Sequence, residues 1–109
     1  MREFSKSQKR QLRDLSALVF ERELKRSLAA LSGHFGDWRA GKVTSLELAQ
    51  HIHEYDYGES RRIGGKFQSK QYEMLVAQGF VEGLLTENEI GPDLFKELQP
   101  AIEFYRDDR

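Results

Sequence analysis

The stretch that decides the fold is LRDLSALVFERELKRSLAALSGHFGDW, residues 12–38. Its apolar side chains recur every three or four residues, which is the spacing of one face of an α-helix. These side chains are Leu12, Leu15, Val19, Phe20, Leu24, Leu28, Leu31, Phe35 and Trp38. We therefore expect one helix over residues 5–40, ended by Gly41, because glycine readily adopts the left-handed conformation that follows a helix C-terminus.

The length of this helix leaves two alternatives. A straight helix over residues 5–40 would extend about 54 Å, whereas a compact domain of about 100 residues has a radius of gyration of roughly 13 Å. Gly33 and Gly36 each cost about 1 kcal/mol relative to alanine within a helix. Either the helix bends or breaks at residues 33–36, or its basic end, residues 1–13, projects.

A capping box predicts where the next helix begins. In the sequence TSLE, residues 44–47, the threonine hydroxyl and the glutamate carboxylate would each accept a hydrogen bond from a backbone amide of the first turn. We expect a helix over residues 45–57, ended by Gly58. Residues 58–66, GESRRIGGK, are then expected to form a basic loop.

The apolar spacing predicts a third helix over residues 68–84. Gly79 and Gly83 fall on its inward face, where they would permit close approach to another helix. A second capping box, TENE, follows and predicts a short helical turn at residues 87–90.

A last helix is predicted over residues 92–107. Pro92 suits its first position, where the missing backbone donor needs no partner. Pro100 must kink or restart this helix, because proline cannot donate the backbone hydrogen bond of a helix interior.

The chain as a whole is therefore predicted to be all-α, a single-domain bundle of about four helices over residues 1–109. No segment alternates apolar and polar residues over enough length to make a strand. The chain has no cysteine, no apolar run near the roughly 20 residues that span a bilayer, and no apolar segment in its charged N-terminus. We expect a cytoplasmic protein without a membrane segment.

The stretch HIHEYDYGESRRIGGK, residues 51–66, invites a chemical interpretation that its spacing does not support. A phosphate-binding P-loop would need glycine at Ser60 and a hydroxyl at Phe67, and no strand precedes it. His51 and His53 stand about 200° apart on a helix and cannot share a metal ion. With no nucleophile motif and no Glu-x-x-His pattern, we expect no catalytic residue, no metal, no cofactor and no enzyme.

The leading hypothesis is a small non-enzymatic binding or regulatory protein that acts through protein–protein contacts or self-association. An antitoxin, immunity or adaptor protein is a setting typical of such small helical chains. The candidate partner-binding residues are Trp38, Arg39, His51, Tyr55, Arg61, Arg62 and Lys66. Trp and Arg are enriched in binding hot spots, and the cations of the expected loop could meet an anionic partner.

Nucleic-acid binding is the alternative hypothesis. Its candidate contacts are Lys6, Lys9, Arg10 and Arg13, which form a basic stripe on the first helix. Against it, the net charge is only −1, whereas nucleic-acid-binding domains are strongly basic. Residues 1–26 carry eight Lys/Arg against four Asp/Glu, and residues 67–109 carry four against nine, so the two ends could instead attract each other within one chain or across a dimer.

Overall fold

A computed structural model describes residues 3–107 and has the predicted all-α fold, with no strand among these residues. The helices are α1 (Lys6–Arg39), α2 (Ser45–Glu54), the π-helical turn η1 (Tyr55–Glu59), α3 (Ser60–Gln68), α4 (Tyr72–Val81), α5 (Glu87–Ile90), α6 (Pro92–Glu97) and α7 (Gln99–Asp107). Four of these helices are long, in agreement with the all-α chain of about four helices that the sequence predicts.

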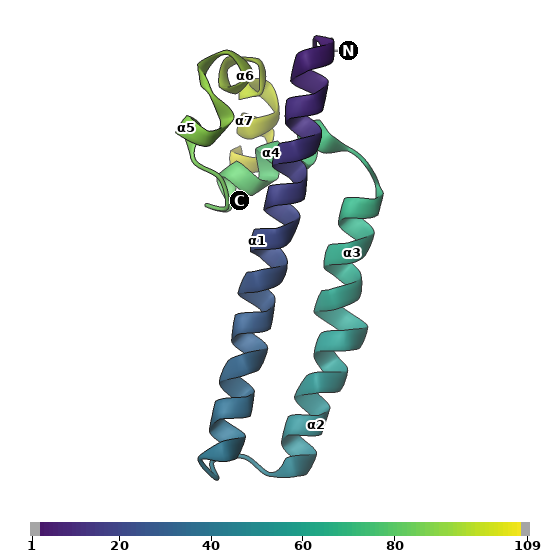
Figure 1. Cartoon of the computed structure of the whole chain (residues 1–109), viewed down its shortest axis with the longest axis vertical. Helices are drawn as coiled ribbons and strands as arrows, with labels where there is room; N and C mark the ends of the chain where they lie inside the picture. The colour runs from purple at the N-terminus through teal and green to yellow at the C-terminus, as the bar shows by residue number, and fades with distance from the viewer. Residues whose placement is uncertain (1–2, 108–109) are drawn as a thin grey trace. The chain divides into compact units, whose positions relative to one another are not determined.

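The first helix is not broken at its glycines (Figure 1). Gly33 and Gly36 are exposed and have open space around them, so no neighbouring chain presses on the helix there. Gly41 has φ +78° and directly follows the helix end, as predicted. Of the two alternatives for this helix, a break at residues 33–36 is therefore wrong, because a continuous apolar stripe outweighs the modest cost of two glycines.

Backbone contacts divide the chain into two compact units, each of which includes part of α1. The first, here called the multi-helix unit, comprises residues 1–21 and 70–109; the second, the hairpin unit, comprises residues 22–69. The single domain that the sequence predicts over residues 1–109 stays a prediction.

The multi-helix unit holds most of the buried apolar side chains. They come from the first part of α1 and from α4 to α7 and their connections: Leu12, Leu15, Val19, Leu75, Val76, Ala77, Leu84, Leu85, Ile90, Leu94, Leu98, Ala101 and Ile102. Gln11 donates a hydrogen bond through Nε2 to the carbonyl of Ile90 at 2.7 Å. Gln11 and Leu12 therefore pack within this unit. The projection of residues 1–13, of which residues 1–2 lie outside the described part of the chain, stays a prediction.

Two helices of this unit, α1 and α4, approach each other closely at Gly79. A Cβ atom on Gly79 would lie 2.6 Å from Cγ2 of the fully buried Val19, so only glycine fits there. The prediction for Gly79 is confirmed. Gly83 does not share this role, because it has φ +79° beyond the end of α4 and no atom within 4 Å of its Cβ position.

The limits of α4 are narrower than the predicted range of 68–84. Lys70 takes a positive φ of 60° ahead of the helix, and Gly83 takes one after it. Two left-handed residues interrupt the helical backbone and leave Tyr72–Val81 as the helix. Apolar spacing alone does not reveal such interruptions.

The C-terminal elements follow their local signals. The capping box at Thr86 and Glu89 is present, and Pro92 occupies the first turn of α6. The helix predicted over 92–107 restarts next to Pro100, one of the two outcomes predicted for this proline, since α6 ends at Glu97 and α7 begins at Gln99. Pro100 therefore stands in the first turn of α7, where its missing amide hydrogen costs nothing.

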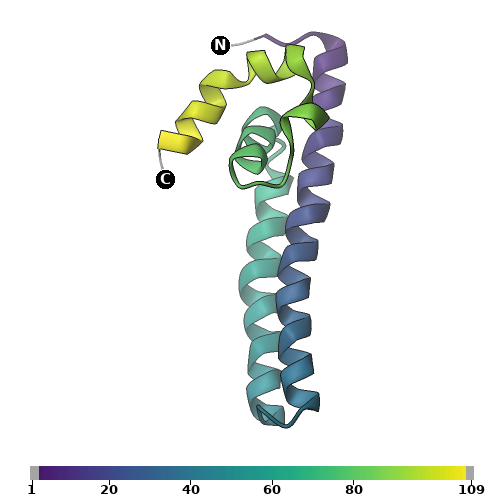
Figure 2. The ribbon, with the colours of Figure 1, turned by 90° about the vertical axis from the view of Figure 1, so that its left-hand side faces the viewer.

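The hairpin unit consists of two antiparallel helical arms. Residues 22–39 of α1 form one arm, and α2, η1 and α3 follow one another to form the second (Figures 1 and 2). The capping box of α2 is present as predicted, with the Glu47 amide donating to Thr44 Oγ1 at 3.1 Å and the Thr44 amide donating to Glu47 Oε1 at 3.0 Å.

The loop predicted at residues 58–66 is wrong, because these residues are helical. Gly58 does not end the helix but lies within η1, whose wider turn takes up one extra residue without breaking the helical path. This turn resets the phase of the arm, and Ile63 on α3 becomes fully buried. Gly64 and Gly65 are accommodated within α3.

A glycine pair tests the packing at Val19. We predict that Gly79→Ala destabilises the protein by about 1–3 kcal/mol through overpacking, whereas Gly33→Ala, in open space on α1, stabilises it by about 0.5–1 kcal/mol. Urea denaturation measures both. Adding Val19→Ala to Gly79→Ala should recover part of the loss, and equal effects of the two glycine substitutions would contradict the described contact.

The capping box makes stability depend on pH. Hydrogen bonds from the backbone and side chain of Thr44 lower the pKa of Glu47 below its ordinary value. Because the folded pKa is the lower one, this contribution is present above the unfolded pKa of about 4.3 and is lost as pH falls through the folded pKa. We predict that Glu47→Gln, which keeps the capping geometry, flattens the stability profile below pH about 4.5; an unchanged profile in thermal denaturation would exclude this role.

Candidate interaction surface on the hairpin

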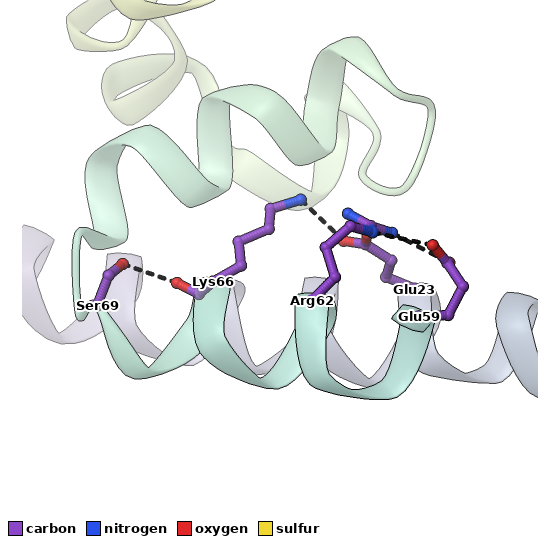
Figure 3. A network of polar contacts seen from close by, with 5 residues as sticks. All are labelled: Glu23, Glu59, Arg62, Lys66 and Ser69. Carbon is purple, nitrogen blue, oxygen red and sulfur yellow. Dashed lines mark hydrogen bonds and ion pairs between the residues drawn. The ribbon is translucent and has the colours of Figure 1, made fainter. Parts of the chain in front are cut away.

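A buried carboxylate joins the two arms of the hairpin unit. The side chain of Glu23 on α1 is only 11% exposed. Its Oε2 accepts a hydrogen bond from Arg62 Nη2 at 3.1 Å, and its Oε1 accepts one from Lys66 Nζ at 3.0 Å (Figure 3). Both oxygens are thus paired with cations, which a charge in this environment requires.

The sequence of α3 explains how two cations reach one carboxylate. Arg62 and Lys66 are four residues apart and therefore lie on the same helix face. Arg62 also donates through Nε and Nη2 to the exposed carboxylate of Glu59, at 2.9 and 3.1 Å. The hydrogen bonds to Glu59 and then to Glu23 raise the pKa of the Arg62 guanidinium, and the bond from Arg62 lowers the pKa of Glu59. The Ser69 hydroxyl donates to the Lys66 carbonyl at 2.7 Å and helps to end α3 (Figure 3).

Two of the predicted partner-binding cations are therefore engaged within the chain. Arg62 and Lys66 bind Glu23 instead of standing in a loop open to an anion. Arg61 is elsewhere on the arm, with its guanidinium 4.2 Å above the ring of the exposed Tyr57. The structure thus separates the basic cluster that the sequence suggested.

The two histidines of the motif face different ways, as predicted. His51 stacks on His34 of α1, with ring centroids 3.7 Å apart and planes at 8°, and its Nδ1 lies 4.0 Å from Glu54. His53 packs against Tyr57. Among residues 3–107 no group of three metal-ligating side chains converges. Because His34 belongs to α1 and His51 to α2, their stacked rings mark a point of contact between these two helices.

The remaining predicted partner-binding residues lie farther along the hairpin. Trp38 is 41% exposed and donates through Nε1 to Ser45 Oγ at 3.0 Å, which ties the end of α1 to the start of α2. Arg39 is exposed beside it. Tyr55, at the start of η1, is half-buried.

Large apolar side chains remain exposed on this unit. Leu28 is 45% exposed, Ile52 39%, Leu46 69% and Tyr57 55%. The buried hydrophobic side chains of residues 22–69 are Leu48 and Ile63. The hairpin therefore buries few of its apolar side chains and presents several to its surroundings, which is typical of an interaction surface.

Helical geometry places some of these side chains together. At about 100° per residue, Leu28 lies about 120° from His34 on α1, and Ile52 lies about 100° from His51 on α2, in the same rotational sense. Because the arms are antiparallel, residues displaced in the same sense from the contact line lie on the same side of the hairpin. We define this side, formed by Leu24, Leu28, Phe35 and Ile52, as the apolar face. Leu46 points away from it, about 200° from Leu48.

The candidate nucleic-acid contacts lie at the start of α1, in the multi-helix unit. Lys6, Lys9, Arg10 and Arg13 are all exposed. The exposed acid Asp14 follows them directly. They form a stripe on one helix.

Comparison of the chain with protein-family models, curated proteins and solved structures gives no match. No helix within residues 3–107 is both long and apolar enough to cross a membrane.

Glu23 is the residue of this site that the sequence interpretation missed. The buried stripe of α1 runs through Leu15, Val19 and Glu23 at steps of four residues, so the spacing itself marks position 23 as inward. An acid at an inward position predicts a cationic partner on the facing helix. An acidic residue at an inward position of the apolar stripe is therefore the sequence signal that could have identified Glu23.

The two glutamates of this network make a matched pair. We predict that Glu23→Gln lowers the free energy of unfolding by about 2 kcal/mol or more, because it removes the buried charge that Arg62 and Lys66 bind. Glu59→Gln, which removes an exposed ion pair to the same arginine, should cost less than about 0.5 kcal/mol. Chemical denaturation with circular dichroism measures both, and equal losses would contradict the central role of Glu23.

Proposed function

We propose that the chain is a small non-enzymatic binding protein that acts through protein–protein contacts made by the apolar face of the hairpin unit. A cytoplasmic antitoxin, immunity or adaptor protein is the setting that we infer for it. The absence of cysteine from the sequence supports a reducing compartment.

The exposure of Leu28 and Ile52 carries this proposal. A leucine and an isoleucine that are 45% and 39% exposed lie on one side of two arms that are fixed to each other. Covering them would release apolar surface from water at about 25 cal/mol per Å². The arms are held by the Glu23 ion pairs and by the His34–His51 stack, so the surface is preorganised before a partner arrives.

Nucleic-acid binding is supported by one observation, the exposure of Lys6, Lys9, Arg10 and Arg13 on one helix. It would produce affinity that falls steeply with salt, because phosphate contacts release counterions. Binding through the apolar face would depend weakly on salt. The two hypotheses therefore differ in a property that is simple to measure.

Photo-cross-linking in living cells tests the proposal. A benzophenone amino acid at position 52 should capture protein, either a partner or another copy of the chain, whereas the same group at position 46 should capture little. The product at position 52 should disappear when Leu28→Glu is added and should resist nuclease.

Equal capture at both positions would contradict the proposal. Binding of labelled DNA or RNA to the purified protein at low salt, abolished by replacing Lys9, Arg10 and Arg13 with glutamine, would favour the alternative function.

A further inference from the structure

We infer that the stacked rings of His34 and His51 form an acid-sensitive contact, which holds the tip of the hairpin unit closed at neutral pH and releases it below about pH 6. The tip is defined here as residues 34–51, which comprise the end of α1, the connection and most of α2. This inference concerns the hairpin unit itself and does not depend on which partner the apolar face binds.

The two imidazole rings lie face to face across the contact between α1 and α2. Their centroids are 3.7 Å apart and their planes differ by 8°, so no water molecule fits between them. Both side chains are half-buried. Histidine is the side chain whose charge ordinarily changes between pH 5 and 8. The stack therefore holds two such groups at van der Waals distance.

A stack of this kind accepts one proton readily and a second proton only with difficulty. One protonated ring is attracted to the π-electrons of the neutral ring beside it. Two protonated rings would place like charges 3.7 Å apart, with no solvent between them to screen their repulsion. The closed tip therefore binds fewer protons than two separated histidines would bind.

The charged groups around the stack are solvated and act on it more weakly. The titratable and charged side chains within one turn of either histidine on its own helix, together with the lysine of the connection, are Asp37, Lys42, Glu47, Glu54 and Tyr55. Glu54 Oε1 lies 4.0 Å from His51 Nδ1 and its side chain is 72% exposed. Glu47 is exposed as well. Because water screens exposed carboxylates, these two favour the first proton, on His51, and leave the second proton opposed.

The remaining charges do not change this balance. Asp37, which follows His34 by one turn, and Lys42 in the connection carry opposite charges, and the phenol of Tyr55 is neutral near pH 6. Arg39 is exposed and lies about 140° from His34 around α1. The second proton on the stack is therefore met mainly by the first.

Protonation consequently opens the tip. The open tip binds two protons where the closed tip binds about one, so the free energy of opening falls as the pH is lowered through the range in which histidine titrates. The pairing of Glu23 with Arg62 and Lys66 involves no residue type that ordinarily changes charge in this range. Acid therefore loosens the tip and leaves the Glu23 end of the hairpin closed.

Titration of the imidazole C–H signals by nuclear magnetic resonance tests the coupling on the full-length chain. The chain has three histidines, and His53, which packs against Tyr57, serves as an internal control. His34 and His51 should each respond in two steps about one pH unit or more apart, whereas His53 should respond in one step. His51→Gln should leave His34 with a single step, and His34→Gln should do the same for His51.

Amide hydrogen exchange tests the opening. After correction for the pH dependence of intrinsic exchange, protection of residues 34–51 in the wild type should fall about tenfold between pH 7 and pH 5, because one pH unit of coupling corresponds to a factor of ten. In His34→Gln, protection should stay constant over this interval, whatever its value at pH 7, since no second charge faces His51. His53→Gln is the matched control and should behave as the wild type does.

A single-step titration of His34 that His51→Gln leaves unchanged would overturn the inference. It would also be overturned by wild-type protection that does not fall on acidification, or by an equal fall in His34→Gln.

Discussion

The hairpin unit depends on the pairing of one buried carboxylate. Glu23 brings a negative charge into the contact between two helices, and such a charge is tolerated only when its oxygens are fully paired. Arg62 and Lys66 provide that pairing from the facing arm. Since they lie one helical turn apart, they fix both the register and the rotation of α3 relative to α1. A shift of either arm by one residue would leave a charge buried without a partner.

This constraint explains why the hairpin can form with so small an apolar interior. Leu48 and Ile63 are its buried hydrophobic residues, whereas the multi-helix unit buries apolar side chains from α1 and from every helix between α4 and α7. In the hairpin, ion pairs, ring stacking and a capped turn set how the two arms are aligned. In the multi-helix unit, the packing of buried apolar side chains sets how its helices are aligned. Contacts within the hairpin therefore do not bury all the apolar side chains of α1 between residues 24 and 35, and Leu28 stays 45% exposed. This exposure is the physical basis of the proposed interface.

The sequence predicted those features that depend on local rules. The apolar spacing gave α1, and the capping boxes at Thr44 and Thr86 located two helix starts, because both signals act within one or two turns. The prediction that Gly58 ends the helix is wrong, since glycine is also compatible with the wide turn η1. The burial of Ile63 beyond this turn is a tertiary feature that local sequence signals do not show. The partners of Arg62 were hidden for the same reason: Glu23 is 39 residues away in the chain.

The central claim, that Glu23 holds the two arms of the hairpin together through Arg62 and Lys66, is tested most directly by a double-mutant cycle in chemical denaturation. Glu23→Gln and Lys66→Met are each expected to lower the free energy of unfolding. The double variant is expected to lose less than the sum of the two losses, by about 0.5 kcal/mol or more, because both single variants remove the same ion pair. Losses that add to within about 0.3 kcal/mol would contradict the account.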